Sequence, residues 1–184
     1  IQGMCEGESA GIVFEMPASM GAQRITQVVA PWGAQFGTNG FSALLDVEVY
    51  DGVSFSGAVV NMGTLVFSLS TTASSNMQVS SHGLNALDTS TYNIVVGIAP
   101  PNGSPLVRRF AICFRCDFNA HPSGSCAAGW PANFFTDNAT AGGLSCNNVI
   151  TPQRTSVMEI AGQGWRDAAL AAVQGVQLCP IYYK

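Results

Sequence analysis

The stretch of sequence that decides the fold is Leu44–Ser56, which reads LLDVEVYDGVSFS. Successive side chains of a β-strand point to opposite faces of the sheet, so strict alternation of apolar and charged residues predicts a half-buried strand. We therefore expect an antiparallel strand here, with its apolar face dry and its carboxylates in water. The alternating residues are Leu45, Val47 and Val49 on one face and Asp46 and Glu48 on the other.

The dipeptide Asp51-Gly52 follows directly and is a hairpin turn signal. A two-residue loop would set polar residues opposite apolar ones, whereas a three-residue loop that starts at Tyr50 pairs Val49 with Val53. Because a slip of one residue turns every side chain to the other face, we expect the three-residue loop. Gly52 would then take the left-handed conformation of a β-bulge.

The rest of the chain also consists of short apolar segments separated by turn-forming residues, a pattern that is typical of strands. Most apolar segments are four to nine residues long and are bounded by Gly, Pro, Asn or Ser. Their spacing predicts an all-β protein, an antiparallel β-sandwich or jelly roll with at most one short helix. That helix is expected at Arg166–Gln174, which is rich in alanine and is followed by Gly175; the competing interpretation is a loop. The expected strands are Gly11–Met16, Ile25–Val29, Phe41–Val49, Val53–Val60, Gly63–Leu69, Tyr92–Ala99, Val107–Phe114, Ser156–Ile160 and Val176–Tyr183.

The first residues differ in character from the rest. The apolar residues Ile12, Phe14 and Met16 stand at every second position. Pro17 and a Gly/Ala/Ser stretch separate them from the next expected strand. Residues 1–18 are therefore expected to form an N-terminal assembly arm, and residues 19–184 a single β-sandwich domain. The arm either completes the sheet of a neighbouring copy by donor-strand exchange or forms the first strand of its own sandwich, and both alternatives stay open.

Composition excludes several classes of protein. Charged residues form only 10% of the 184-residue chain, the net charge is −4, and the only lysine is Lys184. Seven cations against eleven carboxylates do not suit a protein that neutralises nucleic-acid phosphates. The hydrophobic content of 47% excludes intrinsic disorder. No apolar stretch approaches the roughly 20 residues of a membrane-spanning helix, so neither nucleic acid nor a membrane span is expected.

The cysteines indicate an oxidising compartment. Their even number, in a chain that is almost free of lysine and rich in Ser, Thr and Gly, favours disulfides and an extracellular or cell-surface location. Two glycosylation sequons agree with secretion, and Asn138 is a better candidate than Asn102 because Pro105 closely follows the latter. The disulfide candidates are Cys5, Cys113, Cys116, Cys126, Cys146 and Cys179, and the sequence does not choose among their pairings.

One spacing suggests a metal instead. Cys113, Cys116, His121 and Cys126 follow the pattern C-x2-C-x4-H-x4-C, which resembles the retroviral-type zinc knuckle. The resemblance implies a closed tetrahedral zinc site of three thiolates and one imidazole. It covers 14 residues and departs from the family pattern where knuckles have glycine, as at Asp117. We therefore expect disulfides and no cofactor, and keep the zinc set as the alternative.

No motif predicts catalysis. Asp46, Glu48 and Asp51 lie close together and could bind Ca²⁺ or act as an acid–base pair, but ordinary strand alternation favours a solvated face. The chain has neither a nucleophile elbow nor a phosphate-binding loop, so we do not expect an enzyme. The aromatic residues that could stack on sugar rings are Trp32, Trp130, Trp165, Tyr182 and Tyr183.

These properties together predict a structural role. Lysine is a usual means of blunting sheet edges, and here the strands carry none. In kind, the chain resembles self-assembling extracellular β-sandwich subunits of the fimbrial or pilin-like type, which implies a filament or surface layer held by β-strand contacts. The expected partners are copies of the chain itself. The alternative is a secreted β-sandwich module that binds carbohydrate or another ligand, and glycans would then be partners as well.

Overall fold

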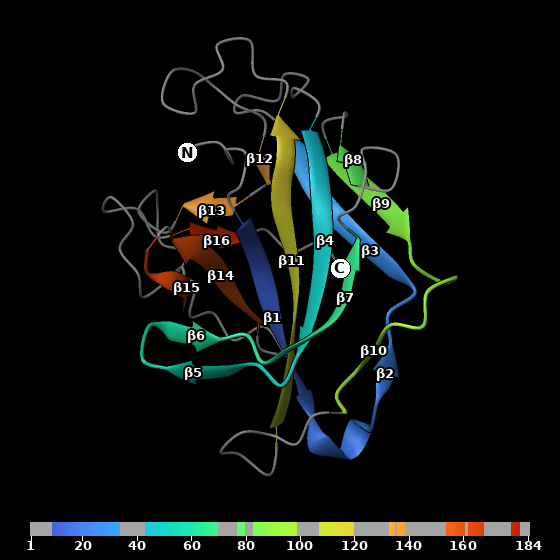
Figure 1. Ribbon diagram of the computed structural model, residues 1–184, viewed down its shortest axis with the longest axis vertical. Coiled ribbons are helices and arrows are strands. Elements are labelled where there is room, and N and C mark those ends of the chain that lie inside the picture. Colours follow the sequence, from blue (N-terminus) through green and yellow to red (C-terminus); the bar gives the residue numbers. More distant parts are fainter. Residues whose placement is uncertain are drawn as a thin grey trace.

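The chain is an all-β protein built from antiparallel sheets, which confirms the fold class predicted from the sequence (Figure 1). The computed structural model describes residues 9–33, 43–69, 77–79, 83–98, 107–119, 133–134, 136–138, 154–160, 162–167 and 178–180. Within these ranges every strand pairing is antiparallel, and the only helical element is a 3-10 turn at Ala18–Met20. The same ranges contain no helix long and apolar enough to cross a membrane.

A nine-stranded sheet dominates the structure. Its long central strands are β1, β11 and β4, and its two ends are the strands β5 and β7. Along the sheet the order is β5 (Ser54–Ser56), β6 (Val59–Asn61), β15 (Gly164–Asp167), β14 (Arg154–Ile160), β1 (Ser9–Pro17), β11 (Val107–Asn119), β4 (Ala43–Asp51) and β7 (Thr64–Leu69), and β8 (Met77–Val79) also pairs with β4.

Three small sheets complete the fold. The first contains β12 (Asn133–Phe134), β3 (Gln27–Gly33) and β9 (Gly83–Asp88). The second pairs β2 (Gln23–Arg24) with β10 (Val95–Val96), and the third pairs β13 (Thr136–Asn138) with β16 (Leu178–Pro180).

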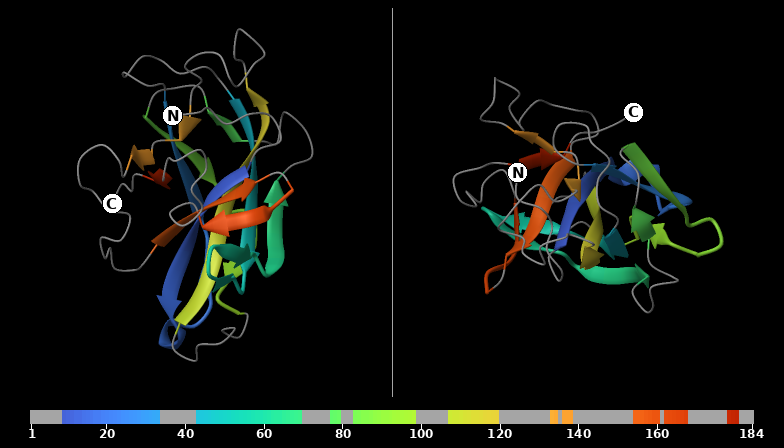
Figure 2. Two further views of the ribbon diagram at one scale, coloured as in Figure 1. Left: turned by 90° about the vertical axis from the view of Figure 1, so that its left-hand side faces the viewer. Right: turned by 90° about the horizontal axis from the view of Figure 1, so that it is seen from above.

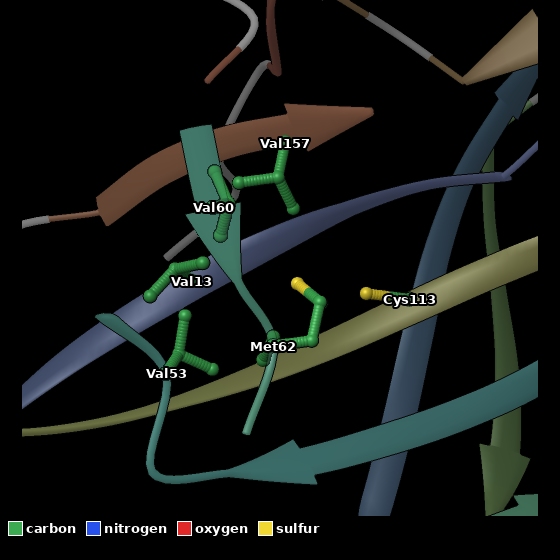
Figure 3. Close-up of a cluster of buried hydrophobic side chains, with 7 residues drawn as sticks. Val13, Val53, Val60, Met62, Cys113 and Val157 are labelled. Carbon is green, nitrogen blue, oxygen red and sulfur yellow. The ribbon is translucent and has the colours of Figure 1, made fainter. Parts of the chain in front are cut away.

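The large sheet is buried on both faces. On its outer face, Val28 and Ala30 of β3 pack against Leu45 and Val47 of β4, which joins the two sheets as a sandwich. On its inner face the sheet curls into a half-barrel, because β14, β15 and the β5–β6 hairpin bend back over β1 and β11 (Figure 2). Figure 3 shows the resulting inner core, in which the side chains of the hairpin region meet those of the central strands: Val13, Val53, Val60, Met62, Cys113 and Val157.

The apolar face of β4 is buried as predicted, but the face that carries the carboxylates is not exposed to solvent. Leu45, Val47 and Val49 are fully buried. Asp46 and Glu48 are also buried, with 6% and 8% of their surface exposed, so the prediction of solvated carboxylates is wrong. The reason is the curl of the sheet, which encloses the face on which these carboxylates lie.

The predicted hairpin after β4 is also wrong. Val49 pairs with Phe67 of β7 and not with Val53, and β5 pairs with β6 alone. Gly52 has the expected positive φ of 80°, and the amide groups of Gly52 and Val53 both donate to the carbonyl of Arg109. The chain therefore leaves the sheet at Gly52 and crosses to the inner face.

The chain returns to the sheet at Gly63, beside the point where it left. Gly63 has a φ of 74°, and a Cβ atom there would lie 2.3 Å from the carbonyl oxygen of Asp51. Between the two glycines the chain forms the β5–β6 hairpin, so the expected single strand Val53–Val60 is two short strands. In Figure 1 this hairpin extends to the left from the crossing point, below β15.

The other expected strands are found with varying accuracy. The segments predicted at Gly11–Met16, Gly63–Leu69, Val107–Phe114 and Ser156–Ile160 correspond to β1, β7, β11 and β14. The expected helix fails at its start, because Arg166 and Asp167 belong to strand β15, and its remaining residues lie outside the described ranges.

Candidate functional site

The three carboxylates of the decisive stretch do not converge. Asp46 and Glu48 lie on the inner face of the sheet, whereas Asp51 lies on the outer face and is 3% exposed. Asp51 accepts hydrogen bonds from the amide groups of Gly97 and Ile98, both at 2.9 Å. Asp51 therefore ties the end of β4 to the segment after β10 and does not form an acid–base pair with the other two.

A polar cluster that the sequence did not predict lies on the inner face around Arg115. Its Nη2 atom is 3.8 Å from Glu48 Oε1 and 3.7 Å from Glu159 Oε2. The hydroxyl of Tyr50 donates to Glu48 Oε2 at 2.8 Å, so Glu48 has two polar neighbours although it is buried. The members come from β4, β11 and β14, and only the strand order β14-β1-β11-β4 of the folded sheet brings them together.

The environment of this cluster keeps its neutral groups neutral. Burial first, and then the hydrogen bond and negative charge of Glu48, raise the pKa of the Tyr50 hydroxyl well above its ordinary value. Burial first, and then the carboxylates of Glu48 and Glu159, also raise the pKa of the Cys113 thiol. Tyr50 is thus a permanent hydrogen-bond donor, and Cys113 is a poor nucleophile because the reactive form of cysteine is the thiolate.

Two cysteines that belong to both the predicted disulfide set and the predicted zinc set, Cys113 and Cys116, lie on opposite faces of the sheet. Cys113 is a free, buried thiol in the inner core, where it points toward Met62 (Figure 3). Cys116 is buried in the outer core beside Leu45. Cys5, Cys126 and Cys146 lie outside the described residues, as does His121, and Cys179 is described only as part of β16.

The pairing of the cysteines therefore stays a prediction. Within the described ranges, no group of three or more His, Cys, Asp or Glu residues is arranged to hold a metal ion. A zinc site on the predicted residues would need thiolates from both faces of β11, since positions three apart on a strand face opposite ways.

Only some of the candidate residues for glycosylation and sugar binding lie within the described ranges. Asn138 ends strand β13, and Asn102 lies outside the described residues. Among the aromatic candidates, Trp165 is half-buried, and its ring packs edge-on against Tyr50 with the ring centroids 6.3 Å apart. Trp165 therefore supports the inner core instead of offering a free stacking surface.

The predicted assembly arm occupies the middle of the large sheet of its own chain. Strand β1 pairs with β11 on one side and β14 on the other. Phe14 stacks on Phe110 with the ring centroids 5.1 Å apart, and Glu15 forms an ion pair with Arg109. Val13 is the most buried residue of the strand, at 1% exposure, so the alternation that singled out Ile12, Phe14 and Met16 does not identify its best-packed side chain.

Among the described strands, the most exposed apolar one is β7, at one end of the large sheet. It reads TLVFSL and contains neither a charged residue nor a proline. Leu65 and Val66 are 49% and 40% exposed, and in the described part of the chain no strand pairs with the outer side of β7. The sequence predicted β7 as a strand, but its position at the edge depends on the crossing at Gly52 and Gly63.

No family model matches this chain, and no curated protein or solved structure is significantly similar to it.

Proposed function

We propose that this protein is an extracellular, non-catalytic structural subunit that assembles with copies of itself through β-strand contacts into a filament or surface layer. The observation that carries the proposal is the edge strand β7, whose exposed residues are apolar and whose outer side has no partner strand in the described part of the chain. An exposed, uncharged edge strand is a template for pairing with another chain.

Proteins that remain monomeric usually protect such an edge with charge, proline or a bulge. Strand β7 has only a bulge, at its pairing with Val49 and Tyr50. Burying the exposed half of Leu65 or Val66 against a neighbour would contribute about 1 kcal/mol for each side chain. Since no charged residue of β7 opposes the contact, a copy of the chain is an acceptable neighbour despite the net charge of −4.

The extracellular location is supported by composition. Six cysteines in a chain with a single lysine, together with the sequon at Asn138, are typical of secreted proteins. The donor-strand alternative remains a proposal as well, and it would require β1 to leave the slot between β11 and β14 and enter the same slot in a neighbour.

The test compares the assembly of two charged variants. The mass of the unaltered chain is measured by light scattering across a range of concentrations, and the material is imaged by electron microscopy. Val66→Lys places a charge on the edge and should abolish large assemblies. Val59→Lys is the matched control, because Val59 is 45% exposed but lies on β6, which is paired on both sides by β5 and β15.

The expected assembly also resists high salt, because salt screens only charge and β7 has none. An unaltered chain that stays monomeric at high concentration would contradict the proposed function. Equal loss of assembly in both variants would show that the contact is not at β7.

A further inference from the structure

We propose, on the basis of the proposed function, that β7 pairs antiparallel with β7 of a second copy about a two-fold axis at Phe67. The repeating unit of the assembly is then a symmetric dimer. Three features of the structure lead to this pairing: the mismatch between β7 and the other exposed edges, the antiparallel order of the sheets, and the position of the bulge in β7.

The other exposed edges are poor partners for β7. Strand β5 offers three residues and β12 offers two, against the six residues of β7. Strand β9 is as long as β7 but contains Asp88, which would bring a charge against the apolar edge. Among the described edge strands, the longest uncharged match for β7 is therefore β7 itself, and an antiparallel partner continues the order of every described sheet.

The bulge determines the register. Phe67 and Leu69 pair with Val49 and Val47 of β4, so their side chains lie on the outer face of the sheet. Leu65 pairs with Tyr50 on the inner face, and Val66 is the extra residue between Leu65 and Phe67.

Registers that differ by two residues all keep matching faces together, and among them the one centred on Phe67 pairs the whole length of β7. In this register Phe67 lies opposite Phe67 of the copy, and Thr64 lies opposite Leu69 of the copy. Ser68 lies opposite the Leu65–Val66 bulge of the copy, just as Tyr50 of β4 lies opposite this bulge within the chain. A shift of one residue sets inner-face residues against outer-face residues, which is unfavourable because directly opposite residues share a face.

A two-fold contact uses the same surface on both copies and therefore closes on itself. Pairing through β7 alone gives a dimer that joins two large sheets edge to edge. A filament or layer then needs a second, different contact on each dimer, and the number of copies in any assembly is even.

Cysteine scanning under mild oxidation tests the pairing, with the unaltered chain as the control for its native thiols. Phe67→Cys should give a disulfide-linked dimer, because residues directly opposite in an antiparallel pair have Cα atoms about 4.5–5.5 Å apart. Thr64→Cys should give none by itself, because the two copies of Thr64 would be four pair positions, or about 13 Å, apart along the strands.

A mixture of two variants provides a second cross-linking experiment that leaves Phe67 unaltered. This matters because Phe67 packs against Tyr92, with the ring centroids 5.1 Å apart. Val66→Cys and Ser68→Cys, at exposed positions, should cross-link strongly when mixed and weakly when alone. Efficient cross-linking of Thr64→Cys alone would indicate a parallel pairing or a different register and would overturn the proposal. So would an assembling chain whose mixed variants do not cross-link, although the proposed function would then stand. A chain that never assembles would overturn both.

Discussion

Replacing Val13 by alanine tests whether β1 belongs to the domain that it occupies in the structure. Val13 is 1% exposed and packs with Val53 and Met62 in the inner core. The substitution removes two methyl-sized groups, each worth about 0.8 kcal/mol, and leaves a cavity under the β5–β6 hairpin. We expect the free energy of unfolding to fall by about 2–3 kcal/mol.

The assay is urea unfolding of the dilute protein, followed by tryptophan fluorescence and circular dichroism. With a denaturant dependence of about 2–3 kcal/mol per molar urea, the midpoint should fall by about 1 M. Val29→Ala is the matched control, because Val29 is 40% exposed on β3 and its loss should change stability by less than about 0.5 kcal/mol.

The two alternatives for β1 differ in how the midpoint depends on protein concentration. If β1 packs in its own sheet, Val13→Ala lowers the midpoint equally at all concentrations. A loss that appears only in assembled material, with the dilute monomer unaffected, would show that β1 acts as an exchanged arm and would refute the reasoning.

Three other predictions test parts of the fold by the same unfolding assay. Gly63→Ala should cost well over 2 kcal/mol, because it adds a backbone clash to an unfavourable positive φ, whereas Gly57→Ala, with a φ of 59° and open space around it, should cost only about 1 kcal/mol; similar losses would contradict the crossing at Gly63. Stability should fall between about pH 8.5 and pH 10, by up to 1.36 kcal/mol per pH unit, because the folded state keeps the proton of Cys113 that the unfolded chain releases; Cys113→Ala should remove the slope in this range, and a slope that persists there would assign it to other groups. Arg115→Gln should cost about 1–2 kcal/mol by removing the cation beside buried Glu48, and no loss would mean that the carboxylate is satisfied without it.

The strand positions that sequence reasoning identified correctly are those with long, regular patterns. Strands β1, β4 and β11 each have a run of apolar residues that extends over several pairs, and their position could be predicted from periodicity alone. Strands such as β2 and β12 have two residues, too few for any period to appear, and they form because longer neighbours hold them in place.

The partners of each strand could not be predicted in the same way. The Asp51-Gly52 signal correctly indicated a left-handed glycine, but a turn signal does not say whether the chain returns along the strand that it has just left. Here the space beside β4 is filled by β7, which follows after twelve intervening residues and is positioned by the close approach of Gly63 to Asp51. The same limit hid the Arg115 cluster, because its members are neighbours only across the sheet.

The burial of Asp46 and Glu48 bears on the uncharged edge at β7. Many of the described charges are engaged within the domain: Arg115 with Glu48 and Glu159, Arg109 with Glu15, and Asp51 with backbone amides. These contacts join neighbouring strands and segments of the curled sheet, and none of them involves β7.

The fold does not require apolar residues at the exposed positions of β7. Val66 is 40% exposed and is the extra residue of a bulge, and Leu65 is exposed by half, so lysine at either position would keep its charge in water. Since such a change costs the monomer almost nothing, folding does not explain why the edge is apolar. Pairing with a second chain does explain it, because the partner strand would cover both side chains and satisfy the open backbone edge.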